Sequence, residues 1–179
     1  RATLWFQNKL RKNLKISDPL RHEWISCLLL NVLIVQFQAY DDDKIWLQAL
    51  ADGKINEQEM ERLVKNDLAN SDTHTPLKNL PPIASMIAWL VLTHHRLPTL
   101  RRPDEFNGYG RDQLTEVLKE IQAEWGYQNK GDAKEYEKNI LEGFNFSEGL
   151  LAQSPAWLKQ VKKWSQRLLA GQDQINTLL

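Results

Sequence analysis

The chain has 179 residues, of which 42% are hydrophobic and 26% are charged, a balance typical of a globular domain with a core of its own. Its 23 basic residues equal its 23 acidic residues, so the overall charge does not indicate a protein that attracts nucleic acid or acidic ligands through a general positive field. The charge is uneven, however, because residues 41–72 hold nine acids and four bases, whereas residues 1–15 and 154–171 hold bases without acids. We expect one domain over residues 1–179 with a polarised surface.

The cysteine content and the apolar runs predict the cellular compartment of the protein. Cys27 is the only cysteine and lies in an apolar run, which excludes a disulfide within the chain and predicts a buried thiol in a reducing cytoplasm. The apolar run 25–37 is interrupted by polar residues and is shorter than the roughly 20 residues of a membrane span, so we expect a buried helix and no membrane association. No leader sequence is visible, and the chain lacks an initial methionine, so we expect a fragment of a longer protein.

The pattern of apolar residues is helical along nearly the whole chain. Helices are predicted at residues 4–14, from Asp18-Pro19 to about Ala39, from the acids 41–43 to a stop at Gly53, at 56–67, 83–93 and 111–126, more weakly at 133–141, and from Ser154-Pro155 to a stop at Gly171. The segment 83–93 is so apolar that we expect it to be buried nearly all round, and the segments 70–79 and 98–110 read as loops. No segment shows the alternation of a strand. The sequence therefore predicts a compact all-α fold of about seven to nine helices, without repeats or a significant sheet.

Three of the four histidines lie where a predicted helix begins or ends. His22 is near the start of its helix, where its neighbours Arg21 and Glu23 are expected on different faces, while His94 and His95 follow the apolar helix that a proline stops. Imidazole is the commonest protein ligand for a transition metal, so one ion held by all three histidines is a candidate site. Consecutive helical residues point about 100° apart, however, and the spacing alone favours an ordinary packed or exposed histidine at each position.

Aromatic and basic residues allow a nucleic-acid interpretation beside a structural one. Bases of a single strand stack on aromatic side chains, but Trp157 and Trp164 share the apolar stripe of their helix, so core packing is the expected role. Arg96, Arg101 and Arg102 follow the histidine doublet and flank the candidate metal site, so they are candidate contacts with a phosphate backbone that would have to run there.

Several motifs of enzymes that bind phosphate or use a nucleophile are missing from the sequence. It contains no Gly-rich phosphate loop, no Cys-x-x-Cys pair, no His-Glu-x-x-His motif and no Gly-x-Ser-x-Gly elbow. A hydrolase with this sequence would therefore need metal chemistry.

Short segments of the chain resemble one known family in their order and spacing. They are residues 6–10 (Phe-Gln-Asn-Lys-Leu), 21–26 (Arg-His-Glu-Trp-Ile-Ser) and 92–98 (Leu-Thr-His-His-Arg-Leu-Pro). Together they are similar to the HD nuclease domain of the CRISPR-associated helicase–nuclease of type I systems. With residues 154–157 (Ser-Pro-Ala-Trp), they look most like the type I-F version. The resemblance covers most of the chain, although its specific motifs lie mainly in the first hundred residues or so.

The resemblance implies a helical domain of the HD superfamily in which His22, His94 and His95 ligate metal. The family's site is completed by a His-Asp pair upstream of segment 6–10 and by a later aspartate, and we expect both to lie outside this chain. Two divalent transition metal ions are implied, and mixed imidazole and carboxylate ligands suit manganese, iron, cobalt or nickel. No catalytic residue beyond the metal ligands is implied.

The activity implied by the resemblance is metal-dependent hydrolysis of single-stranded DNA during CRISPR interference in the prokaryotic cytoplasm. The implied partners are a guide-RNA surveillance complex, the adaptation integrase and phage anti-CRISPR inhibitor proteins. ATP is implied only for helicase domains, which we expect outside this chain.

Two other interpretations remain open. A phosphohydrolase of the wider HD superfamily would act on nucleotides in a closed pocket, whereas DNA needs an open groove beside Arg96, Arg101 and Arg102. A non-enzymatic helical interaction module would dock a partner through the acidic residues 41–72 and bind no metal. The metal interpretation fails if His22 lies more than about 10 Å from the doublet, because ligands of one ion sit within roughly 2.2 Å of it.

Overall fold

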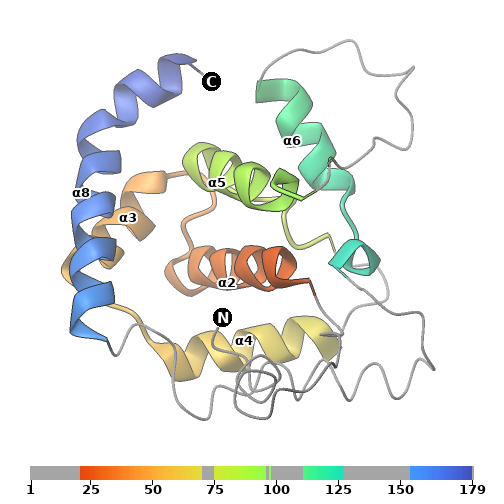
Figure 1. Ribbon diagram of the computed structural model, residues 1–179, viewed down its shortest axis with the longest axis horizontal. Coiled ribbons are helices and arrows are strands. Elements are labelled where there is room, and N and C mark those ends of the chain that lie inside the picture. Colours follow the sequence, from red (N-terminus) through yellow and green to blue (C-terminus); the bar gives the residue numbers. More distant parts are fainter. Residues whose placement is uncertain (1–20, 70–74, 96, 98–110, 127–153, 179) are drawn as a thin grey trace.

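The computed structural model describes residues 21–69, 75–95, 97, 111–126 and 154–178. The elements are, in chain order, α2 (His22–Phe37), α3 (Asp43–Asp52), α4 (Glu57–Ala69), α5 (Pro82–Thr93), α6 (Arg111–Glu120), the 3-10 helix η3 (Ala123–Gly126) and α8 (Pro155–Leu178) (Figure 1). These described ranges contain no strand, so the predicted all-α fold is confirmed. The predicted helices 4–14 and 133–141 and the loop 98–110 lie outside the described residues.

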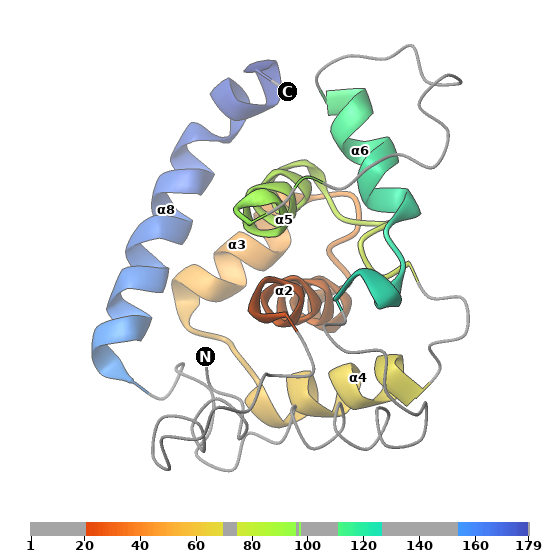
Figure 2. The same cartoon turned by 45° about the vertical axis from the view of Figure 1, so that its right-hand side comes forward.

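The helix α2 occupies the centre of the fold. It contacts α3, α4, α5 and η3, and Figure 2 shows it nearly end-on among them. Because neighbours surround it, side chains on several of its sides are buried, including Trp24, Leu28 and Ile34. The helix ends where Gln38 adopts a left-handed conformation (φ 51°) and its backbone N–H donates to the carbonyl oxygen of Val35. This end agrees with the predicted one near Ala39, but the predicted start at Asp18-Pro19 is wrong, because Arg21 is extended (φ −70°, ψ 135°) and the helix begins at His22.

Asp43, the first residue of α3, links that helix to the start of α5. Its side chain is 1% exposed. Its Oδ1 accepts hydrogen bonds from Nε1 of Trp46 (2.8 Å) and the backbone N–H of Ala84 (3.1 Å), and its Oδ2 accepts one from the backbone N–H of Ile83 (2.8 Å). The two backbone groups belong to the first turn of α5, where they lack partners within the helix and where the helix dipole favours negative charge. The helix α3 is capped instead by Asp42, whose Oδ1 accepts a hydrogen bond from the backbone N–H of Lys44.

Two other predicted helix boundaries rest on local caps and are confirmed. Gly53 ends α3 in the left-handed conformation (φ 74°), as the predicted glycine stop requires. The helix α4 begins after Asn56, whose Oδ1 accepts a hydrogen bond from the backbone N–H of Glu59 at 3.1 Å. Met60 and Val64 of α4 are buried, as their helical spacing predicts.

The prediction that segment 83–93 is buried nearly all round is wrong. Pro82 stands at the first position of α5 and the boundaries agree with the prediction, but Leu90 is 60% exposed. In the described part of the chain α5 packs against α2, α3, α6 and α8, and these helices leave the side that carries Leu90 uncovered.

The segment 111–126, predicted as one helix, is divided in two. The helix α6 ends at Glu120, and the short η3 follows. At the end of η3 the backbone passes so close to α2 that a Cβ on Gly126 would lie 2.1 Å from the indole ring of Trp24. The chain has to turn away from the axis of α6 to approach α2 so closely, and this explains why the helix is interrupted after Glu120.

The last helix differs from its prediction in length and in its packed face. It continues to Leu178, because Gly171 keeps a helical conformation and does not act as a stop. Trp157 and Trp164 are 37% and 55% exposed, so their predicted role in the core is wrong, whereas Ser165 and Gln172 are buried. The helix packs against α3 and α5. The face that contacts them carries Ser165 and Gln172 and is rotated away from the face that carries Trp157 and Trp164.

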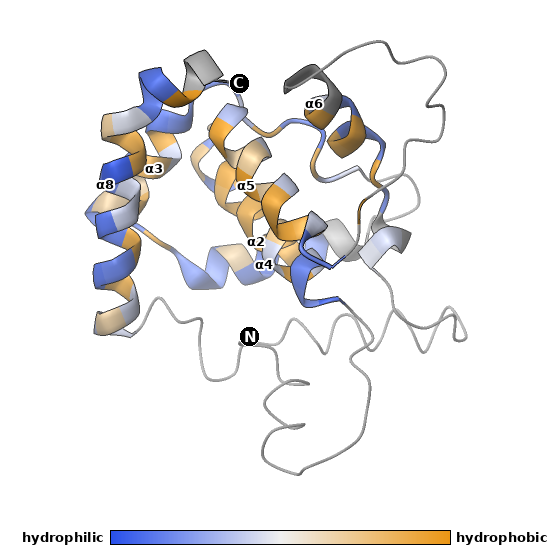
Figure 3. Ribbon diagram, turned by 45° about the horizontal axis from the view of Figure 1, so that its top comes forward, coloured by the Kyte–Doolittle hydropathy of each residue, from blue (hydrophilic) through white to orange (hydrophobic). Residues whose placement is uncertain are grey.

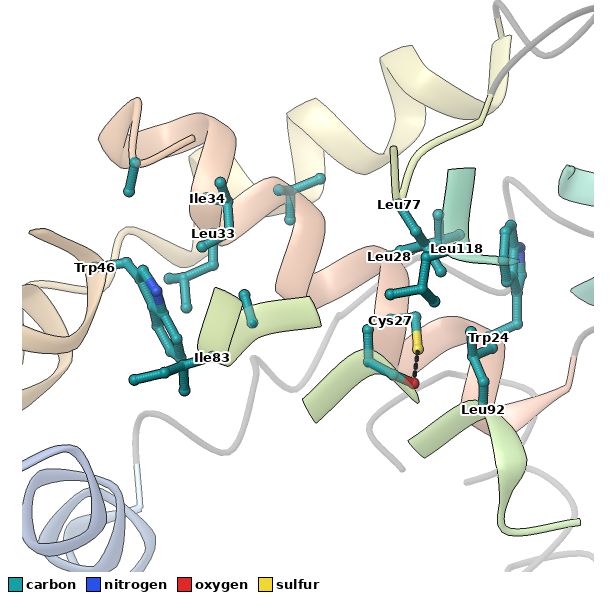
Figure 4. Packing of buried hydrophobic residues seen from close by; sticks show 14 of the residues in the cluster. Trp24, Cys27, Leu28, Leu33, Ile34, Trp46, Leu77, Ile83, Leu92 and Leu118 are labelled. Carbon is teal, nitrogen blue, oxygen red and sulfur yellow. Dashed lines mark hydrogen bonds between the residues drawn. The ribbon is translucent and has the colours of Figure 1, made fainter. Parts of the chain in front are cut away.

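The core lies mainly between α2 and α5, the two most apolar helices (Figure 3). Trp24 and Leu92 lie near one end of this core, and Ile34 and Ile83 lie toward the other (Figure 4). The two helices are therefore antiparallel, with the start of α2 beside the end of α5. Within the described residues, no helix combines the length and the apolar character that a membrane crossing requires.

Gly53 and Gly171 offer a matched pair of alanine substitutions. Gly53→Ala is expected to lower the free energy of unfolding by about 1 kcal/mol, because an L-residue is strained at φ 74°. Gly171→Ala is expected to raise it by about 0.5–1 kcal/mol, since the nearest atom to the new Cβ would be 4.0 Å away within a helix. Urea unfolding followed by circular dichroism measures both, and a stabilising Gly53→Ala would contradict the left-handed cap.

Asp43→Ala is expected to lower the free energy of unfolding by about 3–5 kcal/mol, because it leaves three buried donors without their acceptor. The matched control is Asp41→Ala, two residues earlier on the surface, where the change should stay within about 0.5 kcal/mol. Equal effects of the two substitutions in urea unfolding would show that Asp43 does not hold the start of α5.

Candidate metal centre

The antiparallel packing of α2 and α5 brings the three predicted histidines together. His22 is the first residue of α2, and His94 caps the end of α5 in a helical conformation (φ −67°, ψ −15°), with His95 next in the chain. Nε2 of His22 lies 3.1 Å from Nε2 of His94 and 3.3 Å from Nε2 of His95. These distances are far shorter than the roughly 10 Å beyond which three side chains cannot share an ion.

The cluster is open to solvent. His94 and His95 are exposed, and the side chain of His22 is 39% exposed. The three rings nevertheless lie close together, with ring centroids 5.2 Å apart for His22 and His94, 5.0 Å for His22 and His95, and 3.9 Å for His94 and His95. A small ion can therefore reach the nitrogens without any opening of the fold.

The Nδ1 atoms of His22 and His94 face acceptors on the side of each ring away from the cluster. Nδ1 of His94 is 2.5 Å from the carbonyl oxygen of Val91, one helical turn earlier. Nδ1 of His22 is 3.3 Å from Oε2 of Glu23. A proton on Nδ1 is favoured by such an acceptor and leaves the lone pair of Nε2 directed at the cluster, as a metal ligand requires.

The spacing of the Nε2 atoms fits the coordination sphere of a transition metal ion. Bonds of about 2.0–2.1 Å place neighbouring nitrogens roughly 2.9–3.4 Å apart, from octahedral to tetrahedral geometry. Two neutral Nε2 atoms that face each other at 3.1 Å repel unless a cation or a proton lies between them. The donor set thus suits a divalent ion, and His22, Glu23, His94 and His95 form a group that could hold one.

Glu23 is the residue of this group that the sequence analysis missed. Its side chain is 2% exposed, and Oε1 lies 3.5 Å from Nη1 of Arg21. Arg21 and Glu23 were expected on different faces of the helix, but they contact each other. The sequence did contain a signal for this residue. A carboxylate next to His22 at the start of a mostly apolar helix has little access to water, so it is expected to lie beside a cation or a hydrogen-bond donor.

The remaining predicted site residues give no further ligand among the described residues. Arg96, Arg101 and Arg102 lie outside the described part of the chain. Cys27 is buried as predicted, and this burial, with a smaller contribution from the charge of Glu23, raises its pKa to about 12. The side chain is therefore a neutral thiol, whereas metal ligation needs the thiolate.

Comparison with known proteins gives two relatives that cover 94% of this chain. One is the CRISPR-associated nuclease/helicase Cas3 subtype I-F/YPEST of Pectobacterium atrosepticum, which is 27% identical over 176 residues. The other is the protein of the same description from Pseudomonas aeruginosa, which is 30% identical over 174 residues. No protein-family model matches the chain.

The chain spans only 16% and 15% of the length of these two relatives. Its similarity therefore concerns one part of each relative and extends over nearly all of this chain. The resemblance predicted from the short motifs is confirmed: the chain is similar to part of the Cas3 nuclease/helicase of CRISPR subtype I-F.

Proposed function

We propose that this chain is a metal-dependent nuclease domain of the HD class, which hydrolyses phosphodiester bonds of single-stranded DNA. The observation that carries the proposal is the convergence of three histidine nitrogens, with Nε2 of His22 at 3.1 and 3.3 Å from Nε2 of His94 and His95. The similarity to two proteins described as nuclease/helicases supports the same reaction class.

In this proposal His22, His94 and His95 hold one of two divalent ions, drawn from manganese, iron, cobalt or nickel. A bound ion supplies Lewis-acid chemistry, which lowers the pKa of a coordinated water and stabilises the oxygens of the scissile phosphodiester. Neutral imidazoles leave the positive charge of an ion uncancelled, and this charge favours an anionic substrate such as the DNA backbone. The chain's own contribution is to fix three ligand nitrogens in one place.

The open position of the cluster supports a polymeric substrate over a small nucleotide in a closed pocket. Because His94 and His95 are exposed, a DNA strand can pass over them without entering the interior. Arg96, Arg101 and Arg102, which follow the doublet in the sequence, are the proposed contacts with its phosphates.

The acidic stretch 41–72 gives less support to a non-enzymatic docking module. Asp43 is buried as the cap of α5, and Glu59 forms an ion pair with Arg62. Such acids have structural roles within the chain, so the stretch offers a partner less free charge than its composition suggests.

The wider assignment extends the proposal to the cell. The domain, taken as residues 1–179, would work in the prokaryotic cytoplasm and be recruited to DNA by a guide-RNA surveillance complex. The adaptation integrase and phage anti-CRISPR proteins are its further proposed partners, and ATP would serve only helicase domains.

His94→Ala tests the proposed function in the protein that contains this domain. Metal-dependent degradation of circular single-stranded DNA is expected to fall by at least about 100-fold, because one of three nitrogen ligands is lost. The thermal midpoint of the metal-free protein should stay nearly unchanged, since an exposed side chain contributes little to stability.

The control for this experiment is Gln166→Ala, an exposed substitution on α8 that should leave cleavage at the wild-type rate. Cleavage that survives His94→Ala at the wild-type rate, in a protein that keeps its midpoint, would contradict the proposed nuclease site.

A further inference from the structure

We propose that Glu23 is a positioning residue of this centre, whose carboxylate holds His22 with Nε2 turned toward His94 and His95. The inference rests on the proposed function, because it concerns the same metal site. In this role Glu23 acts through the imidazole of His22 and not as a ligand of the ion.

The Glu23 carboxylate is buried beside the first residues of α2. The side chain is 2% exposed, and Nη1 of Arg21 lies 3.5 Å from Oε1 while Nδ1 of His22 lies 3.3 Å from Oε2. Oε1 has no hydrogen-bond partner among the described residues. The 3.5 Å contact with Arg21 offsets only part of the cost of burying a carboxylate whose Oε1 accepts no hydrogen bond from the described residues, so a second role of this acid would explain its position.

The imidazole of His22 is turned so that Nε2 points away from Glu23 and toward the other two histidines. The carboxylate lies beside Nδ1, while Nε2 faces the doublet at 3.1 and 3.3 Å. An acceptor beside one ring nitrogen places the proton there and fixes the orientation of the ring, which raises the basicity of the other nitrogen. His94 has the same arrangement with a backbone acceptor, the carbonyl oxygen of Val91. In two of the three histidines, His22 and His94, an acceptor beside Nδ1 thus orients the ring.

The segment that carries Glu23 is itself held in place by contacts with η3. The backbone N–H of Arg21 donates to the carbonyl oxygen of Gly126 at 2.8 Å, and the guanidinium carbon of Arg21 lies 5.9 Å from the ring centroid of Trp125. On the other side of Glu23, Trp24 is fully buried against Gly126. Anchors on both sides limit the movement of the carboxylate relative to the imidazole.

The experiment measures Co²⁺ binding to the metal-free full chain by calorimetry, for the wild type, Glu23→Ala and Glu23→Gln. Glu23→Ala is expected to raise the Kd for Co²⁺ by about 10–100-fold, as loss of an outer acceptor does at other metal sites. Glu23→Gln should raise it less, because an amide oxygen can still lie beside Nδ1 as an acceptor. The matched control is Glu59→Gln, which removes an acid from the first turn of α4 and should leave the Kd unchanged.

A second measurement does not depend on any variant. Nitrogen NMR of His22 in the metal-free wild type, recorded at about pH 8, should show the proton on Nδ1. A proton on Nε2 would overturn the inference, even if Glu23→Ala failed to fold.

The binding results separate this inference from the proposed function. Tight Co²⁺ binding that Glu23→Ala leaves within about 2-fold would overturn the positioning role alone. Loss of binding in Glu23→Gln as complete as in His94→Ala would also overturn it, because Glu23 would then be a ligand. A wild-type chain that binds no Co²⁺ would overturn the proposed metal site and this inference together.

Discussion

The hydrogen bonds of Asp43 to the start of α5 are the constraint on which the geometry of the candidate centre depends. The carboxylate accepts two backbone N–H groups of the first turn of α5, and the same side chain is tied to α3 through Trp46. The helix α5 has 12 residues and is therefore about 18 Å long. Hydrogen bonds at its first turn fix the direction of the helix, and His94 lies at its other end. Asp43 therefore helps to position His94 and His95 although it is remote from them.

The position of the cluster at two helix ends has an electrostatic consequence. The start of α2 is the positive end of one helix dipole, and the end of α5 is the negative end of another. The negative end favours a cation near the last carbonyl groups, one of which already faces Nδ1 of His94. The positive end favours an anion, and Glu23 lies in that first turn. A metal ion and an anionic phosphodiester, the two charges of the proposed reaction, would each meet a favourable helix end.

Much of the fold was predictable because the boundaries of its helices are set locally. Pro82, Gly53 and Asn56 act through their own dihedral angles or side chains, and these effects belong to the residue and its neighbours. The errors arise where distant parts of the chain decide. The exposed face of α8, with Trp157 and Trp164, is selected by α3 and α5, and no periodicity within the helix identifies its partners. For the same reason the spacing of the three histidines identified them as candidate ligands but could not predict that His22 lies beside His94, 72 positions later in the chain.

Glu23 shows how a sequence carries a signal that helical geometry conceals. Side chains of helical neighbours diverge by about 100°, which argued against contact between residues on either side of His22. Arg21, however, precedes the helix in an extended conformation (φ −70°, ψ 135°), so its side chain is free to return to the first turn. The more useful signal is the single acid of α2, a helix that is mostly apolar. Because such a helix is surrounded by its neighbours, a carboxylate in its first turn is forced into the interior, where it is stable only beside a cation or a donor. His22 precedes Glu23, and its imidazole has Nδ1 beside the carboxylate and Nε2 toward His94 and His95. The buried acid therefore orients a proposed metal ligand, and this role would explain why the cost of its burial is tolerated.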